Sequence, residues 1–204
     1  MAMRVHELHP SLIHAPLALL PAATLVDLAA ASRLDRRADR AGQVLWWAAV
    51  GSGLFAGLAG MAASQEVDPR SDRARDMMFL HGIGNVGVVV AALGLATWRA
   101  RNRASITSAM AGLVASGAAA YTAYLGGELV YAHGVGVEAL GGAPARAPAL
   151  FSGPGVARLG RDAVRGLVWL LSRGARAVTG REKVDRSALG PIAEAGTGAP
   201  LALH

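Results

Sequence analysis

Cysteine is absent from this chain of 204 residues. Its absence excludes disulfides, thiolate-bound iron–sulfur clusters, covalent attachment of c-type haem and Cys-ligated zinc within the chain. Any cofactor must therefore be held by histidine, carboxylate or backbone groups. The sequence also shows no nucleophile–base pair and no phosphate-binding loop, which disfavours hydrolase and kinase chemistry.

Charge is also scarce. Only 17% of the residues are charged and 53% are hydrophobic, and the mean hydropathy is +0.37. The charged residues are excluded from long windows, which indicates membrane spans rather than a soluble core. The net charge of +6 comes almost entirely from arginine in the connections and the C-terminal region. We interpret it as a determinant of membrane topology and of binding to anionic lipid, and not as a nucleic-acid surface.

The apolar windows predict an all-α integral membrane protein, in which residues 1–138 form an antiparallel bundle of four spans. A cleavable signal peptide is the alternative interpretation of the first span. It is disfavoured because Asp27 interrupts the apolar run and because one arginine, Arg4, precedes it. The four predicted spans are Ser11–Ala31, Val44–Ala63, Met77–Trp98 and Ile106–Tyr131.

Beyond the bundle, residues 139–157 are rich in Gly, Ala and Pro and are predicted to be a linker. Residues 158–180 have apolar residues at helical spacing with arginines on the other faces, which predicts a basic amphipathic helix on a membrane surface. Residues 181–204 are predicted to be a disordered tail.

Within the second span, Trp46 and Trp47 are expected to be an interfacial pair, and Gly53 and Gly57 to admit another helix or a flat ligand.

The connections predict the orientation. Those after the first and third spans carry seven arginines, against four in the N-terminal segment and the connection after the second span. The positive-inside rule then places both termini on the outer side of the plasma (inner) membrane.

Histidines recur at one end of the predicted spans. His9 lies at the mouth of the first span, His14 and His81 about one turn inside the first and third spans, and His133 at the mouth of the fourth. The alternation of the spans brings these four to a similar depth, with Glu128 beside them. Because ionisable groups inside a membrane tend to face a functional site, we expect a shared site there. His6 is expected to be an ordinary surface residue.

Three short motifs carry a resemblance. Residues 9–16 read HPSLIHAP, His81 is followed by Asn85, and residues 126–131, GGELVY, lead to HGVGV at 133–137. This pattern resembles the domain of unknown function 2231 (DUF2231) family over residues 6–138. The resemblance implies a four-span bacterial membrane domain whose relatives sometimes accompany Rieske iron–sulfur proteins. Ala15 departs from the bulkier residue of the family pattern, and the basic helix lies outside it.

Two kinds of bound cofactor would suit these residues. A non-covalent b-type haem would take His14 and His81 as its first ligand pair, with His9 and His133 as a second pair or as propionate partners, and would serve electron transfer rather than catalysis. Asn85, Glu128 and Tyr124 would orient the ligands. A zinc or copper site formed by His14, His81, His133 and Glu128 is the alternative. A membrane scaffold without a cofactor is the third.

Overall fold

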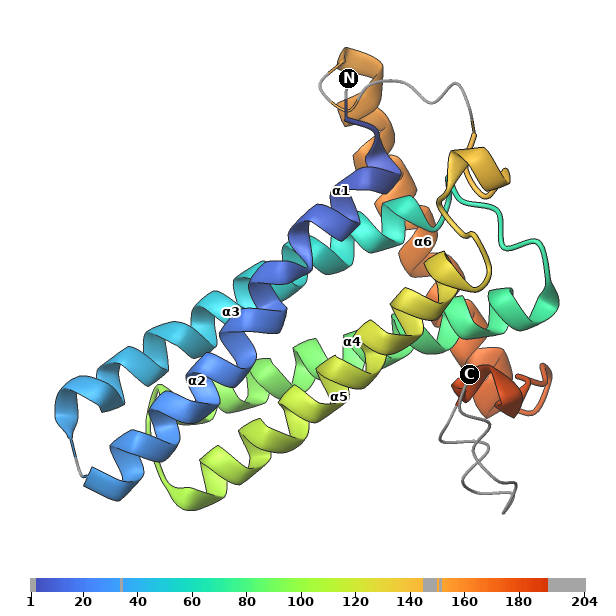
Figure 1. The fold of residues 1–204 in the computed structure, drawn as a ribbon. Coiled ribbons are helices and arrows are strands. Elements are labelled where there is room, and N and C mark those ends of the chain that lie inside the picture. Colours follow the sequence, from blue (N-terminus) through green and yellow to red (C-terminus); the bar gives the residue numbers. More distant parts are fainter. Residues whose placement is uncertain (1–2, 34, 145–149, 151, 191–204) are drawn as a thin grey trace. The chain divides into compact units, whose positions relative to one another are not determined.

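The computed structural model describes residues 3–33, 35–144, 150 and 152–190 (Figure 1). The described residues form helices and no strand, which confirms the all-α prediction. Two single-turn 3-10 helices, η1 and η2, lie among the longer helices. The elements are α1 (Val5–Leu12), α2 (His14–Arg33), α3 (Arg36–Ala63), α4 (Asp72–Arg99), α5 (Ile106–Tyr131), η1 (Glu138–Leu140), α6 (Gly153–Val178) and η2 (Arg186–Leu189).

Four helical segments are long and apolar enough to cross a membrane, as predicted. Three contain 28 residues and one contains 26, against the roughly 20 that a bilayer core requires. The first three are longer than the predicted spans because charged or polar turns continue the helices past the apolar windows. Large apolar side chains such as Phe55, Val90 and Val114 are 62% to 72% exposed, as expected where lipid replaces water. The four segments are His6–Arg33, Arg36–Ala63, Asp72–Arg99 and Ile106–Tyr131.

The residues group into two compact units. We call Glu7–Gly60 with Gly84–Thr122 the bundle unit. We call the unit that comprises Met1–His6, Met61–Ile83 and Ala123–His204 the terminal unit. Several helices therefore contribute one part to each unit.

The bundle unit contains a part of each of the four spans, and consecutive helices run antiparallel (Figure 1). Its core is built largely from small side chains, which lets the helix backbones approach closely. Gly53 shows this, because a Cβ atom there would lie 3.2 Å from Cγ2 of Val89, whereas Gly57 has open space around it. The buried core comprises Leu20, Ala23, Trp46, Ala49, Val50, Val88, Ala92, Ala96 and Ala119.

The first span is interrupted at Ile13, between α1 and α2. Pro16 explains the position of this break. Its ring nitrogen has no hydrogen to donate to the carbonyl of Leu12, and the ring crowds that carbonyl. The helix resumes because Leu17 N donates to Ile13 O at 3.2 Å. His14 is therefore the first residue after the break.

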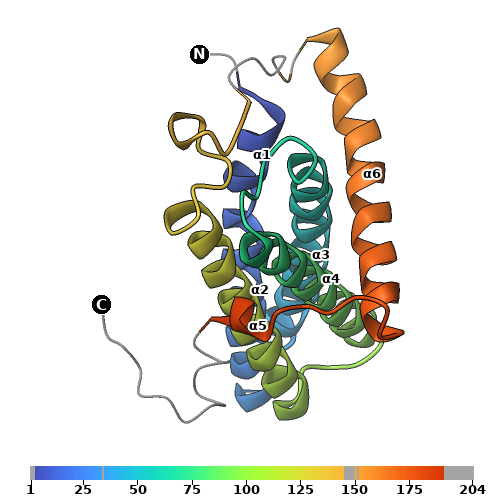
Figure 2. The same cartoon turned by 90° about the vertical axis from the view of Figure 1, so that its right-hand side faces the viewer.

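In the terminal unit, α6 is one continuous helix that runs past the first turns of α4 (Figure 2). Ser152 caps its N-terminus by accepting a hydrogen bond from Gly155 N. After α6 the chain continues through residues 181–190, where Glu182 contacts Arg173 of α6. These are the first ten residues of the predicted tail. Residues 191–204 of that tail, and residues 145–149 and 151 of the predicted linker, lie outside the described residues.

Candidate functional site

His9 is held by α3 inside the bundle unit. Its Nδ1 lies 2.9 Å from the carbonyl oxygen of Ala56. A carbonyl only accepts, so Nδ1 carries the hydrogen and Nε2 carries the lone pair. The ring lies against Gly60, where a Cβ atom would be 2.9 Å from Nδ1. A hydrogen bond from Nδ1 to a backbone carbonyl is the usual way in which a protein orients a histidine that binds a metal through Nε2.

His14 lies on the surface of the bundle unit. Five residues separate His14 from His9, so a helix with 3.6 residues per turn places the two side chains on different faces. An exposed side chain in a span faces lipid or another chain. His9 therefore has a defined hydrogen bond in the bundle unit. The role of His14 as a cofactor ligand stays a prediction.

Asn85 belongs to the bundle unit and joins two helices there. Its Oδ1 accepts a hydrogen bond from the hydroxyl of Thr122 in α5 at 2.9 Å. A Cβ atom at Gly84 would lie 2.7 Å from Cγ2 of Thr122, so α4 and α5 approach closely at this level. This contact is structural, and the predicted role of Asn85 beside a cofactor remains a prediction.

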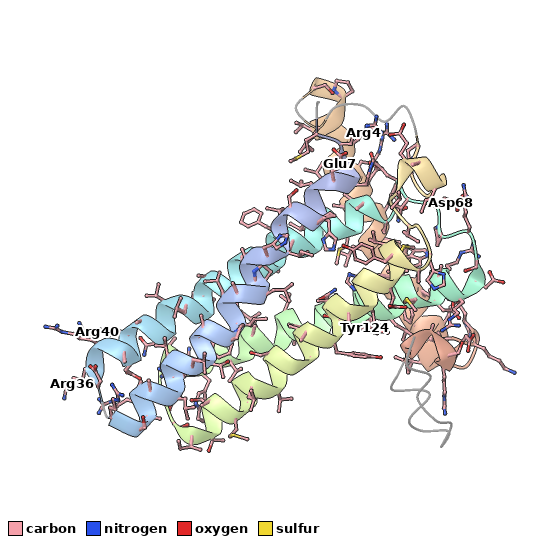
Figure 3. The ribbon with its side chains drawn as sticks, viewed as in Figure 1. Arg4, Glu7, Arg36, Arg40, Asp68 and Tyr124 are labelled. Carbon is pink, nitrogen blue, oxygen red and sulfur yellow. The ribbon has the colours of Figure 1, made fainter. Side chains whose placement is uncertain are left out.

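His81 belongs to the terminal unit and packs against α5. A Cβ atom at Gly126 would lie 2.9 Å from Cε1 of His81, so the ring occupies the space that glycine leaves. In the same unit Glu128 and His133 are half-buried. Tyr124 is 42% exposed (Figure 3).

His6 corrects an expectation from the sequence. It is buried rather than an ordinary surface residue, with 8% of its surface exposed. Its Nδ1 and its backbone N lie 3.3 Å and 3.2 Å from Oε2 of Glu66, within the terminal unit. The other carboxylate oxygen, Oε1, is buried without a hydrogen-bond partner. The sequence carried no signal for this contact, because it joins residues 60 positions apart in two polar segments.

A second polar cluster, which the sequence analysis missed, lies in the bundle unit around Arg99. The side chains of Arg99 and Asp27 are both 0% exposed. Arg99 donates to Oδ2 of Asp27 at 2.7 Å and to Oδ1 of Asp39 at 2.7 Å. The Asp39 oxygen also accepts from Ala104 N at 2.7 Å. Asp27 could have indicated this cluster from the sequence, because a carboxylate inside an apolar span requires a partner.

Trp46 completes this cluster and corrects the predicted interfacial pair. Its indole Nε1 donates to Oδ2 of Asp27 at 3.0 Å, and the residue is 0% exposed. Its neighbour Trp47 is 46% exposed and alone fits the interfacial prediction. Arg36 and Arg40 show the contrasting environment, since their side chains point away from the helices (Figure 3). Because every charged group of the cluster is paired, we interpret it as structural.

Among the residues that the structure describes, no group of three or more His, Asp or Glu side chains is close enough to hold a metal ion. The predicted ligands belong to both units, His14 to the bundle unit and His81, Glu128 and His133 to the terminal unit, so their shared site remains a prediction.

The model of the DUF2231 family, described as a predicted membrane protein, matches residues 5–139. The chain belongs to the DUF2231 family. The match covers all three motifs and leaves α6 outside, as the resemblance in the sequence indicated. Family membership supports a multi-pass membrane protein and supplies no activity. No curated protein and no solved structure matches the chain.

Proposed function

We propose that this chain is a membrane protein that transfers electrons through a non-covalent b-type haem. In this proposal Nε2 of His9 is an iron ligand. The observation that carries the proposal is the hydrogen bond between His9 Nδ1 and the Ala56 carbonyl. It fixes the tautomer with its lone pair on Nε2, which is the form that binds iron. When bound, the haem would supply one-electron chemistry.

The coordination requirement favours haem over a metal ion alone. A zinc or copper site takes three or four ligands from the protein, and the described residues do not gather three. A porphyrin supplies four nitrogens itself, so one or two histidines complete the iron. Gly60 leaves the space on α3 that the ring of His9 occupies.

The second ligand would come from His14, His81 or His133, which the alternation of the spans puts at similar depth. His81 is the ligand that the sequence pattern pairs with the first span, and its ring packs against Gly126. Glu128, Asn85 and Tyr124 remain candidates for orienting a ligand or for contacting a propionate. The resemblance of the motifs adds a Rieske-type protein in the bacterial inner membrane as a candidate redox partner.

The visible spectrum of the protein purified in detergent tests this proposal. We expect a Soret band, with sharp α and β bands after reduction by dithionite. His9→Ala should abolish or shift these bands. The second ligand is identified by comparing three further variants, His14→Ala, His81→Ala and His133→Ala, because the variant that removes it should also abolish or shift the bands. His6→Ala is the control, because His6 lies against Glu66 and should leave the bands unchanged.

The alternatives predict different results. A colourless protein that carries stoichiometric zinc or copper would support the metal-site hypothesis and overturn the haem proposal. A protein with neither cofactor, in which the histidine variants behave as the wild type does, would support a membrane scaffold.

A further inference from the structure

One face of α6 is fixed within the terminal unit. Gly166 packs directly on the carbonyl of Met61, and a Cβ atom at Gly82 would lie 3.1 Å from Cδ1 of Leu170. Arg173 pairs with Asp76 and donates to the carbonyl of Arg75 at 2.9 Å. These contacts join α6 to the last turn of α3 and the first turns of α4.

The same part of the helix carries an aromatic contact. The rings of Phe79 and Trp169 meet edge to face, with centroids 6.4 Å apart. The guanidinium of Arg173 lies 4.9 Å from the Phe79 centroid and 5.7 Å from that of Trp169. This combination of cation–π and ion-pair contacts fixes the rotation of α6 about its axis.

That rotation leaves an apolar stripe uncovered. Val164, Val168, Leu171 and Val178 follow one another at spacings of four, three and seven residues, so they share one helix face. They are 62%, 61%, 53% and 89% exposed. In a helix surrounded by water this face would be turned inward.

Arginine side chains accompany the stripe. Those of Arg161, Arg165 and Arg176 are 54%, 63% and 48% exposed. Asp162 is the single acidic residue of α6, and its side chain is 6% exposed. The exposed surface of α6 therefore combines apolar side chains with positive charge, which is the pattern of a helix that binds an anionic bilayer surface.

The contacts of α6 also define its depth. Met61 lies in the last turn of the span Arg36–Ala63, and Phe79 and Gly82 lie in the first half of the span Asp72–Arg99. Because these helices of 28 residues are longer than the roughly 20 residues that a bilayer core requires, we infer that α6 packs near the boundary of that core. At this position the lipid itself can cover the apolar stripe, and no partner protein is needed.

We propose that α6 is an interfacial helix that binds the anionic lipid surface. Val164, Val168, Leu171 and Val178 enter the boundary between headgroups and acyl chains, and Arg161, Arg165 and Arg176 bind lipid phosphates. The negative charge of the headgroups complements the arginines, and the acyl chains cover the stripe. This surface is independent of the histidines and of any cofactor.

The absence of native cysteine makes a direct test simple. Single variants Val164→Cys, Val168→Cys and Leu171→Cys of the full chain would carry a nitroxide label, with Lys183→Cys as a water-exposed control beyond the helix. The proteins would be placed in nanodiscs of phosphatidylcholine, with or without phosphatidylglycerol. Power saturation measures how readily the label meets oxygen, which dissolves in lipid, and a nickel chelate, which stays in water.

With phosphatidylglycerol present, we expect the three stripe labels to be accessible to oxygen and shielded from nickel, while the Lys183→Cys label meets nickel. Shielding should be weaker in phosphatidylcholine alone and in the combined variant Arg161→Gln, Arg165→Gln and Arg176→Gln, because the apolar contacts remain and the attraction to anionic headgroups is removed. Nickel access at the stripe in anionic nanodiscs would overturn the proposal. Equal shielding in both lipids, or strong dipolar broadening between labels from a second copy of the chain, would overturn it as well.

Discussion

Asp27 and Arg99 form a fully buried ion pair in the bundle unit, with Nε of Arg99 2.7 Å from Oδ2 of Asp27. The pair connects the later turns of α2 to the end of α4, 72 residues away in sequence. Asp39 and Trp46 satisfy the remaining groups. A charge inside a membrane protein is tolerated when it is paired in this way, so this cluster fixes how the helix ends of this unit meet.

Removing one partner should be strongly destabilising. We predict that Asp27→Asn or Arg99→Gln lowers the free energy of unfolding by about 3–5 kcal/mol, because the other charged group is left buried without its partner. Unfolding in detergent titrated with SDS, followed by circular dichroism, measures this change. Arg36→Gln is the matched control, since Arg36 is exposed at the start of α3. A cost for Arg99→Gln no larger than that of the control would contradict the structural role.

The small residue behind His9 gives a more specific prediction. In Gly60→Ala the new methyl group would lie within 3.0 Å of two ring atoms of His9 and push the ring off the Ala56 carbonyl. We expect the haem bands to weaken or shift, while the helix content of the protein stays unchanged. Gly57→Ala adds the same methyl group one turn earlier in α3, where nothing lies within 4 Å. Equal spectra for the two variants would remove His9 from the site.

The segment after α6 should respond to acid. The pKa of the Glu182 carboxyl is lowered because it accepts hydrogen bonds from Arg176 and Arg173. A lowered pKa means that the contact stabilises the fold above the pKa of an unfolded glutamate and is lost as pH falls through the folded value. Asp185 behaves alike, since its pKa is lowered by hydrogen bonds from Ser187.

A nitroxide on Lys183→Cys would report this release. We expect the label to be ordered at neutral pH and to become mobile as the pH is lowered through the acidic range in which carboxylates titrate. In Glu182→Gln, which has no charge to lose, the label should be more mobile already at neutral pH. A label whose mobility is the same in both proteins at every pH would show that Glu182 does not hold the segment.

The orientation of the chain remains a prediction from the connections. The positive-inside rule counts basic residues in short loops and close to the span ends, and the five arginines of α6 lie farther from the end of α5 than that. The margin therefore stays at seven arginines against four, and we predict that both termini face the outer side of the membrane. The histidine-bearing span ends and the redox partner would then lie on that side.

Labelling intact cells with a membrane-impermeant maleimide distinguishes the two orientations. Arg37→Cys lies in the exposed first turns of α3, and Lys183→Cys lies on the side of the termini. We expect Lys183→Cys to be labelled from outside and Arg37→Cys to be labelled only after the cells are opened. The reverse pattern would place the termini in the cytoplasm.

The spans were predictable because apolar length is a local property of the sequence. The limits of α5, Ile106–Tyr131, match the predicted fourth span, since no charged turn continues that helix. Side-chain environments were less predictable, because they depend on helix rotation. The spacing of five residues places His9 and His14 on different helix faces, but which of the two faces meets α3 depends on how α1 and α2 pack. The pairing of Asp27 with Arg99 required knowing which helix ends meet.

Measuring the haem content of the purified protein is the clearest test of whether this chain holds a b-type haem. Conversion of any bound haem to its pyridine complex identifies the haem type and gives its amount per chain. We predict that the wild-type protein contains b-type haem in stoichiometric amount. His9→Ala should lose this haem and keep its helical fold. A folded wild-type protein, expressed with sufficient haem supply, that contains no haem would contradict the account.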